Sequence, residues 1–411
     1  MKNILTIIAG VTLCNLTVAF AGAPIPPPST MPPTQQPASS APADPQKRPF
    51  TVTALIRGEY DDNINTSNSN EQSSWKLIGE PSIIYNKKDD NTSYAARYTL
   101  SAAYYFDRPG NKDVDLSHEI YGRIKHQFSD RVGIDVRDRL RITQEPAILD
   151  APGSVFIRTN NDYIFNAFDA DLMIQWTPKF GTISGYGNDV WDYEDKGISR
   201  FEDRMVHKGK HEFRFLVVPT TTLVVGGLIG YHDYWNVRRD FVNYTGMAGV
   251  DHDLTRQATI GLRAGITHTD FIDGGSYNSP YGQVLLNIET GANSSINASY
   301  SHTIASTSLN TYYAREADTF TLGGRYQWTP KFSTRVQGMA TFGEHKRQFV
   351  LGLPTITKIR ENIYGVDVGM NYEVNKNLEL EAGYIYTTVD SNIQFNEYDR
   401  NRVYFGVRGT Y

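Results

Sequence analysis

Apolar and polar residues alternate along most of residues 50–411, with a period of two. Phe320, Leu322 and Trp328 stand on one face of such a stretch, with Thr321 among the polar or small residues between them. A period of two predicts β-strands with one apolar and one polar face. We find no persistent helical period, so the sequence predicts an all-β fold.

Counting such segments predicts about 18 strands, many of them 12 to 16 residues long. The segments are 50–60, 75–86, 92–106, 114–128, 131–143, 162–177, 180–193, 205–217, 221–234, 240–253, 256–271, 278–290, 293–306, 314–329, 332–345, 358–374, 377–389 and 398–411. A strand tilted by about 45° needs roughly 9–11 residues to cross a bilayer, so these segments predict a transmembrane antiparallel β-barrel. Pro81 predicts a bulge or a break in pairing. The count falls to 16 if 75–86 and 180–193 are not strands.

Short connections alternate with longer ones along the chain. The short ones include 129–130, 177–179, 329–331 and 375–376, and the longer ones, rich in Asn, Asp, Ser and Gly, include 61–74, 145–161 and 348–357. With an even strand number, this is the layout of bacterial outer-membrane barrels, with short periplasmic turns and longer extracellular loops. Side chains do not fill a barrel this wide. We therefore expect an aqueous channel, and the loop 145–161 is the best candidate for a segment that folds inward and narrows it.

Charged residues on the polar faces of the strands are the candidate pore lining. Arg137, Arg139 and Arg141 share one face of one strand, and that face is expected to be wet because unpaired buried charges are costly. The basic residues assigned to the lumen are Arg57, Arg97, Arg123, Lys125, Arg137, Arg139, Arg141, Arg214, Arg263, Arg325, Arg335 and Arg408. The acidic residues are Glu119, Asp135, Asp169, Asp171, Glu212, Asp367, Glu373, Glu379 and Glu381.

Two interpretations of these charges stay open. In the functional one, the basic cluster on strands four and five opposes Glu373, Glu379 and Glu381, and the resulting field favours anionic solutes such as acidic saccharides. In the structural one, the charges form cross-strand ion pairs that stiffen a wet wall, each contributing under ~1 kcal/mol. Three like charges in a row on one strand favour the functional interpretation.

The N-terminal residues predict export of the chain. Lys2, an apolar run and Ala19-Phe20-Ala21 predict a signal peptide over residues 1–21. Cys14, the only cysteine, lies within it, so the mature chain has no disulfide or thiolate site. Residues 22–49 hold ten of the 19 prolines and predict a disordered periplasmic tether before the barrel. The mature chain has 39 basic and 45 acidic residues, and this mildly acidic balance does not indicate nucleic-acid binding.

The sequence QWTPKF occurs twice, at 175–180 and 327–332. The proline of each copy predicts a tight turn, and the aromatic residues on either side continue the apolar face of the strands. Aromatic residues gather where a barrel meets the membrane boundary. The candidate interface aromatics are Trp176, Phe180, Trp328, Phe332 and Tyr411.

The sequence predicts neither an enzyme nor a metal site. The nearest approaches to a catalytic arrangement are His302 beside Ser301, His268 near Asp270 and His118 near Asp115. None has a nucleophile-elbow sequence or an identifiable third partner. The aspartate-rich loops lack the spacing of an EF-hand. We expect no cofactor.

Two stretches resemble a known family. The sequence EYDDNI at 59–64 and the sequence LSHEIYGRIKHQFSDRVGIDVRDRLRI at 116–142 are similar to the putative β-barrel porin 2 family of Gram-negative outer-membrane proteins. The resemblance implies a large barrel, with some relatives tied to exopolysaccharide systems. The alternating C-terminal strand ending in Tyr411 also resembles the signal by which the barrel-assembly machinery recognises outer-membrane barrels.

We therefore predict an outer-membrane, porin-like channel of a Gram-negative bacterium. It would passively conduct small hydrophilic solutes, with a preference for anionic or acidic saccharides. The alternative is an exit channel for an exopolysaccharide secretion system, acting with periplasmic export partners. Other expected partners are outer-membrane lipid, lipopolysaccharide and the barrel-assembly machinery.

Overall fold

The computed structural model describes residues 49–110, 112–144, 162–291, 293–307, 312–348, 359–392 and 397–411. The predicted signal peptide, nearly all of the predicted tether and the predicted constricting loop 145–161 lie outside these residues. The strands are β1 (Phe50–Asp61), β2 (Ser74–Lys88), β3 (Thr92–Tyr105), β4 (Val114–Ser129), β5 (Val132–Thr143), β6 (Tyr163–Thr177), β7 (Phe180–Tyr193), β8 (Arg204–Val218), β9 (Thr221–Tyr234), β10 (Phe241–Thr255), β11 (Ala258–Phe271), β12 (Gly275–Gly291), β13 (Ser294–Ser306), β14 (Tyr312–Gln327), β15 (Phe332–Gln348), β16 (Arg360–Asn375), β17 (Leu378–Ser391) and β18 (Tyr398–Thr410). A short helix, α1 (Lys196–Glu202), lies between β7 and β8.

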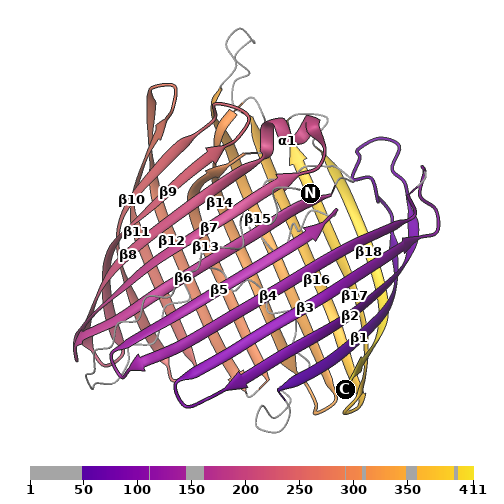
Figure 1. The fold of residues 1–411 in the computed structure, drawn as a ribbon, viewed down its shortest axis with the longest axis horizontal. Coiled ribbons are helices and arrows are strands. Elements are labelled where there is room, and N and C mark those ends of the chain that lie inside the picture. Colours follow the sequence, from indigo (N-terminus) through magenta and orange to yellow (C-terminus); the bar gives the residue numbers. More distant parts are fainter. Residues whose placement is uncertain are drawn as a thin grey trace.

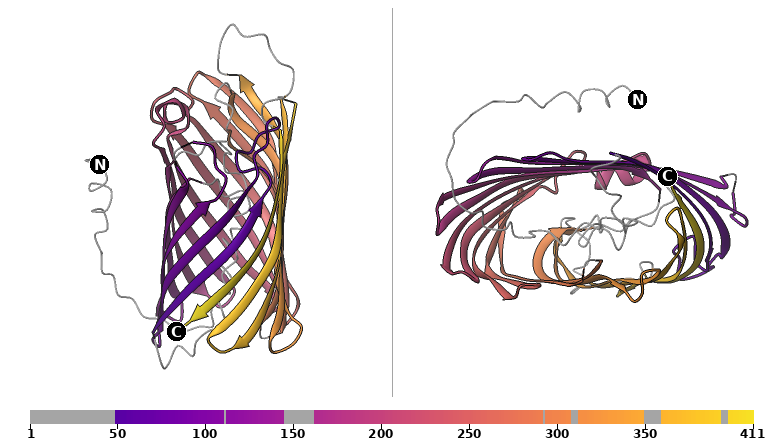
Figure 2. Two further views of the ribbon diagram at one scale, coloured as in Figure 1. Left: turned by 90° about the vertical axis from the view of Figure 1, so that its right-hand side faces the viewer. Right: turned by 90° about the horizontal axis from the view of Figure 1, so that it is seen from below.

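The 18 strands form a closed barrel. Each strand pairs antiparallel with its neighbours in the chain, and β1 also pairs with β18, from Thr53 opposite Thr410 to Asp61 opposite Arg402. Figure 1 shows the tilted strands of the wall, and Figure 2 shows that the wall forms a flattened ring. The predicted 18-stranded antiparallel barrel is therefore confirmed, with β2 and β7 both present.

Strand alternation gives the wall an apolar outer face. Ile56, Ile266 and Phe405 are 62%, 65% and 58% exposed, whereas Leu55 and Tyr404, each one position away from an exposed residue, are 1% and 2% exposed. Charged groups such as those described below occupy the inner face. A large exposed apolar surface is unfavourable in water and is the surface that lipid covers in membrane barrels.

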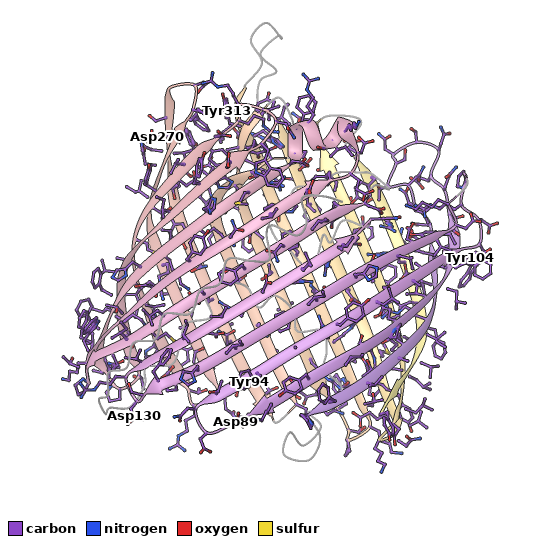
Figure 3. The ribbon with its side chains drawn as sticks, viewed as in Figure 1. Asp89, Tyr94, Tyr104, Asp130, Asp270 and Tyr313 are labelled. Atoms are coloured by element: carbon purple, nitrogen blue, oxygen red, sulfur yellow. The ribbon has the colours of Figure 1, made fainter. Side chains whose placement is uncertain are left out.

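The two ends of the barrel differ. The short-turn end carries Phe50, Tyr411 and tight reversals such as the one at Asp89 (Figure 3). The long-loop end carries α1, Asp270 and Tyr313 (Figures 1 and 3). Among the described residues, no helix has the length and apolar character needed to cross a membrane.

Pro81 interrupts pairing as predicted, without a bulge. It lies opposite Ala54 in β1, but on the β3 side the pairs pass from Gly79 opposite Ala102 directly to Ser82 opposite Thr99. The register is the same on both sides of the gap. Proline has no N–H to donate, so the ladder loses pairs here while the strand continues.

The ends of β13 and β14 leave the wall and turn into the lumen. Pairing of β12 with β13 stops at Gly282 opposite His302, whereas pairing of β13 with β14 continues to Ser306 opposite Ala314. Ile304 is then buried in an apolar cluster with residues of β9, β10 and β11, including Phe241. We call residues 303–306 and 312–317 the inward tip; the orange strand ends inside the ring in Figure 2 belong to it.

Candidate functional site

The inner wall of β5 to β8 carries a ladder of charges. Lys210 on β8 reaches across Gly185 on β7 to bond Asp171 on β6 at 2.7 Å. Closer to the long-loop end of the same strands, Lys208 bonds Asp189 at 2.8 Å. We call Lys208, Lys210, Asp171 and Asp189 the charge ladder. Neither lysine nor Asp189 was among the predicted lumenal residues, although the alternation of β8 places both lysines on the face that carries Glu212 and Arg214.

The neighbouring wall of β3 to β5 concentrates positive charge. Arg97, Arg139 and Arg141 all contact the single carboxylate of Glu119, with Arg139 at 3.0 Å and Arg141 at 2.7 Å. Arg137, on the same face, bonds Asp171 at 3.0 Å instead. The structure therefore separates the predicted arginine row: Arg139 and Arg141 share one acid, and Arg137 joins the charge ladder.

Most other predicted lumenal charges form ion pairs, all of them between strands except Arg214 with Glu212, which both lie on β8. The pairs are Arg123 with Asp135, Arg214 with Glu212 and Asp251, Arg263 with Asp251, Arg335 with Asp367, and Arg57 and Arg408 with Glu381. Lys125 lies opposite Asp135 in the strand register, Arg325 opposite Arg335, and Glu373 opposite Glu379. Lys208 approaches the predicted acid Asp169 at 3.9 Å, and Arg408 approaches Glu379 at 3.8 Å.

Two of the three acids predicted on β16 and β17, Glu379 and Glu381, have arginine partners near the barrel closure. Glu381 accepts Arg57 at 2.5 Å, although the two residues are 324 positions apart in sequence, and it accepts Arg408 at 3.1 Å. Arg335 reaches over two further strands to the hydroxyl of Tyr404 at 2.7 Å. Glu379 and Glu381 therefore have arginine partners, and among the described side chains three arginines gather at the one carboxylate of Glu119.

Both QWTPKF copies build the same turn. In each, the glutamine side chain donates to the carbonyl of the threonine two residues on at 2.6 Å, from Gln175 and from Gln327. The tryptophan ring N–H donates to a threonine six residues on at 3.0 Å, in the Trp328 copy to Thr334. The structural repeat therefore extends two residues beyond QWTPKF. Trp176, Trp328 and Tyr411 are exposed at the short-turn end, and Phe180 and Phe332 are half-buried.

The histidines considered for catalysis have other partners. His118 bonds the Tyr98 hydroxyl at 2.9 Å, and His268 bonds Asn278 at 2.7 Å and Asp270 at 3.0 Å. Ser301 and His302 are adjacent in a strand and point to opposite faces, so the predicted pair is not brought together.

His302 instead joins a polar seam where β12 and β13 separate. The seam consists of Tyr277, Ser279, His302, Glu316 and Lys346. Nε2 of His302 lies 3.3 Å from the Ser279 hydroxyl and 3.2 Å from Glu316, while Nδ1 lies 2.9 Å from Asp318. Ser279 is 2% exposed and its hydroxyl also donates to Glu316. Because the Ser279 hydroxyl is buried and already donates to Glu316, this arrangement favours a structural role.

At the long-loop end, Arg239 lies in the segment between β9 and β10 and bonds to the segments that follow β7 and β13. Its guanidinium donates to the Phe201 carbonyl at 3.0 Å, to Glu202 at 3.3 Å and to the Thr307 carbonyl at 3.0 Å. Arg239 is fully buried. Burial raises the pKa of the Glu202 carboxyl, and the two neighbouring arginines, Arg239 and Arg204, act in the opposite direction.

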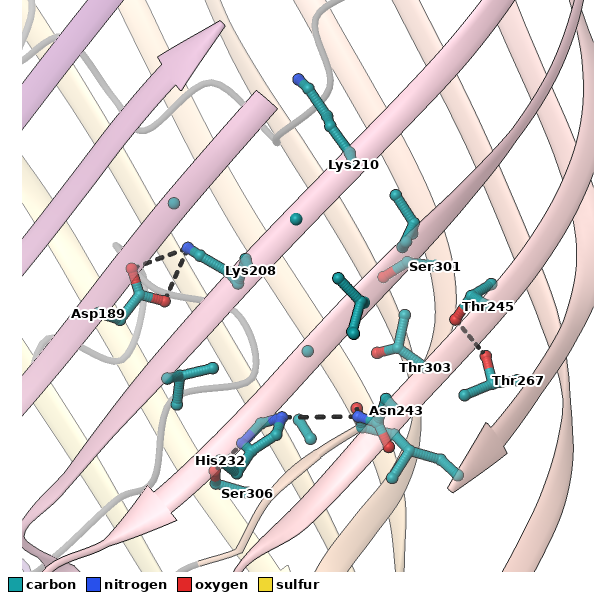
Figure 4. Close-up of a pocket in the computed structure, with 18 of the residues that line it drawn as sticks. Asp189, Lys208, Lys210, His232, Asn243, Thr245, Thr267, Ser301, Thr303 and Ser306 are labelled. Carbon is teal, nitrogen blue, oxygen red and sulfur yellow. Dashed lines mark hydrogen bonds and ion pairs between the residues drawn. The ribbon is translucent and has the colours of Figure 1, made fainter. Parts of the chain in front are cut away.

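A cavity of about 430 Å³ lies within the lumen, between the charge ladder and the inward tip. Residues of every strand from β5 to β14 line it. The tip docks on the opposite wall through Ser306, which bonds His232 at 2.8 Å, and through the Ile304 carbonyl, which accepts from Asn243 at 3.2 Å. Figure 4 shows Lys208 and Asp189 on one side of this cavity and Ser301 and Thr303 on another.

These features define a large, closed β-barrel with an apolar exterior and a charged lumen. The model of the family described as putative beta-barrel porin 2 matches residues 325–411, which hold β15 to β18. This finding supports the family resemblance, although the two stretches that first indicated it lie outside the matched range.

Several solved structures are similar to the chain. OccAB4 of Acinetobacter baumannii is 10% identical, with 90% of this chain and 100% of that chain covered and a TM-score of 0.45. A BenF-like porin from Pseudomonas fluorescens Pf-5 is 10% identical, with 88% and 99% covered and a TM-score of 0.45. OpdK of Pseudomonas aeruginosa, in a structure with vanillate, has the same four values as the BenF-like porin. No curated protein sequence matches the chain.

Proposed function

We propose that the protein is an outer-membrane channel that passively conducts small hydrophilic solutes. The observation that carries this proposal is the distribution of side chains in a closed barrel: apolar residues face outward, and ion pairs and hydroxyls face a lumen that 18 strands make too wide to fill. The family match over residues 325–411 supports the same class. In such a channel, the short turns would face the periplasm and the long loops would face the outside of the cell.

We further propose that the channel prefers anions, including acidic saccharides. Among the described side chains, three arginines gather at the one carboxylate of Glu119, and this local concentration of guanidinium groups supports the preference. A fixed excess of one sign raises the local concentration of solutes of the opposite sign. The balanced ion pairs elsewhere contribute little to selectivity, because each carries both signs.

The first prediction tests this preference in a planar bilayer under a salt gradient. The double variant Arg139→Gln/Arg141→Gln removes two positive charges and leaves Arg97 on Glu119. We expect the reversal potential to move toward cation selectivity, because the local concentration of guanidinium groups is lost.

The matched control is Arg123→Gln/Asp135→Asn, which removes one charge of each sign from a bidentate pair at 2.9 and 2.6 Å. It should leave the reversal potential unchanged. An unchanged potential in the arginine variant would favour the structural interpretation of the charges, and a protein without any conductance would contradict the channel itself.

Lipid, lipopolysaccharide and the barrel-assembly machinery remain the proposed partners, the last through β18. The exit channel for an exopolysaccharide remains the alternative. It predicts loss of secreted polymer when the gene is deleted, with little change in general permeability. A porin predicts the reverse.

A further inference from the structure

Hydroxyl groups line the side of the cavity formed by β10, β11, β13 and β14. They belong to Thr245, Thr267, Ser301, Thr303 and Thr319. Thr245 and Thr267 bond each other at 2.8 Å and are both buried. A hydroxyl supplies one donor and two acceptors, so a bonded pair retains capacity for a ligand hydroxyl. Arg315 of β14 also lines the cavity, and its charge is paired with Glu361 at 3.4 Å, so the hydroxyls are the uncharged polar groups that this side offers to a ligand.

The charge ladder forms the other side, and its charges are matched. Lys208 lies 2.8 Å from Asp189, and Lys210 lies 2.7 Å from Asp171. Each ammonium has three donors and each carboxylate about four acceptor positions, so these pairs also retain hydrogen-bonding capacity. A charge on the ligand gains no net attraction from such matched pairs, whereas hydroxyl groups, which both donate and accept, can bond to both members of each pair.

The cavity also offers space and an apolar edge. The rings of Phe165 and Trp191 pack with their centroids 5.0 Å apart and their planes tilted by 44°, and both residues line the cavity. Gly230 lies between Lys208 and Asn243 in the strand register and has no side chain that would fill the cavity at this point. A Cβ atom at Gly230 would meet no heavy atom closer than 3.7 Å. The volume is within the range of ~300–1,000 Å³ for small-ligand pockets.

We propose that this cavity binds the hydroxylated ring of a saccharide. The ring hydroxyls would bond the threonine and serine hydroxyls on one side and the lysine–aspartate pairs on the other, and the C–H faces would pack on the aromatic edge. A charge on the sugar adds no affinity here, because the ladder is balanced. The proposal rests on the proposed channel, through which solutes reach the cavity.

The test is saturation-transfer NMR on the full-length, detergent-solubilised barrel with three probes: glucose, glucuronate and cyclohexanecarboxylate. We expect saturable binding of both sugars and none of cyclohexanecarboxylate, which has a ring of the same size and a charge but no hydroxyls. Gly230→Leu should weaken sugar binding at least tenfold by filling the cavity.

Gly323→Leu is the matched control, because Gly323 lies on the same face of β14 as Thr319, outside the cavity, with no heavy atom within 4 Å of an added Cβ. It should bind sugars as the unchanged protein does. Equal binding of cyclohexanecarboxylate, or full sugar affinity in Gly230→Leu, would overturn the inference. A barrel that conducts without saturable sugar binding refutes only this site, and one that binds sugar without conducting refutes only the channel.

Discussion

Glycines on the inner face determine how far a charged side chain reaches across the barrel wall. Lys208 lies over Gly187, and a Cβ atom there would come within 2.7 Å of Asp169 Oδ1 and 2.9 Å of Lys208 Cε. Gly369, on β16, gives the same room to Arg335, whose Nε would lie 2.6 Å from an added Cβ. Single residues without a side chain thus allow contacts between strands that are not neighbours, an ion pair from Lys208 to Asp169 and a hydrogen bond from Arg335 to Tyr404.

At this scale we predict that Gly187→Val destabilises the barrel. The added side chain displaces Lys208 from its carboxylates and overpacks the wall, a change that costs about 1–3 kcal/mol in typical cores. The measurement is the temperature at which the band of folded protein disappears when samples are heated to increasing temperatures before gel electrophoresis. Gly246→Val, where nothing lies within 4 Å of an added Cβ, should leave that temperature unchanged, and equal shifts in both variants would contradict this explanation.

The strands β13 and β14 lie in the barrel wall near the short turns. Beyond the pair of Gly282 and His302, they leave the wall and enter the lumen. The separation of β12 from β13 removes ladder hydrogen bonds, and the polar seam replaces them with side-chain contacts. Glu316 is central, because it bonds Tyr277 and Lys346, both at 3.0 Å, as well as His302 and Ser279.

We therefore predict that Glu316→Gln loosens the inward tip. Loss of the charge weakens four contacts at once, so single-channel records should show more frequent transient current steps at constant voltage. Glu344→Gln is the control, since Glu344 contacts Lys346 at 2.9 Å from a more exposed position. The same current pattern in both variants would show that the seam does not hold the tip.

For the whole molecule, closure of the barrel depends on β1 meeting β18. A buried ionic cluster lies beside this contact: Asp61 accepts Lys76 at 2.8 Å and Arg400 at 2.5 Å, and Lys76 also bonds Glu59 at 2.8 Å. All four side chains are at most 6% exposed. Two acids and two bases compensate one another there, so loss of one base leaves an uncompensated buried acid.

Arg400→Met should accordingly destabilise the closed barrel by about 3–5 kcal/mol, the usual cost of breaking a buried pair from one side. Urea unfolding in detergent or lipid vesicles measures this change. Lys87→Met removes a base from the exposed pair with Asp89 at 3.0 Å and should have no measurable effect. Equal losses of unfolding free energy in the two variants would mean that burial does not determine how much the cluster stabilises the barrel.

Much of this architecture is readable from the sequence. The period of two predicted 18 strands, and the alternation of short and long connections predicted their antiparallel order, because both depend only on neighbouring residues. QWTPKF was correctly interpreted as a turn for the same reason. Pro81 was identified as a break in pairing from the chemistry of proline alone.

The site was less accessible to sequence reasoning. Lys208, Lys210 and Asp189 share the alternation of the selected charges, but their importance comes from glycines on the strand between them. His302 could not be assigned, since its partners Ser279 and Glu316 belong to strands on either side of a separation that no local pattern marks.

Strand periodicity and turn chemistry are local, so the strands, the turns and the face of the wall on which each residue stands can be predicted from the order of the amino acids. Which charges compensate one another, and where the lumen narrows to a cavity, depends on contacts that form only in the folded barrel. Closure brings Arg57 to Glu381 across 324 positions, and the inward tip brings Ser306 to His232. Such contacts depend on the curvature of the closed sheet, which no short stretch of sequence encodes.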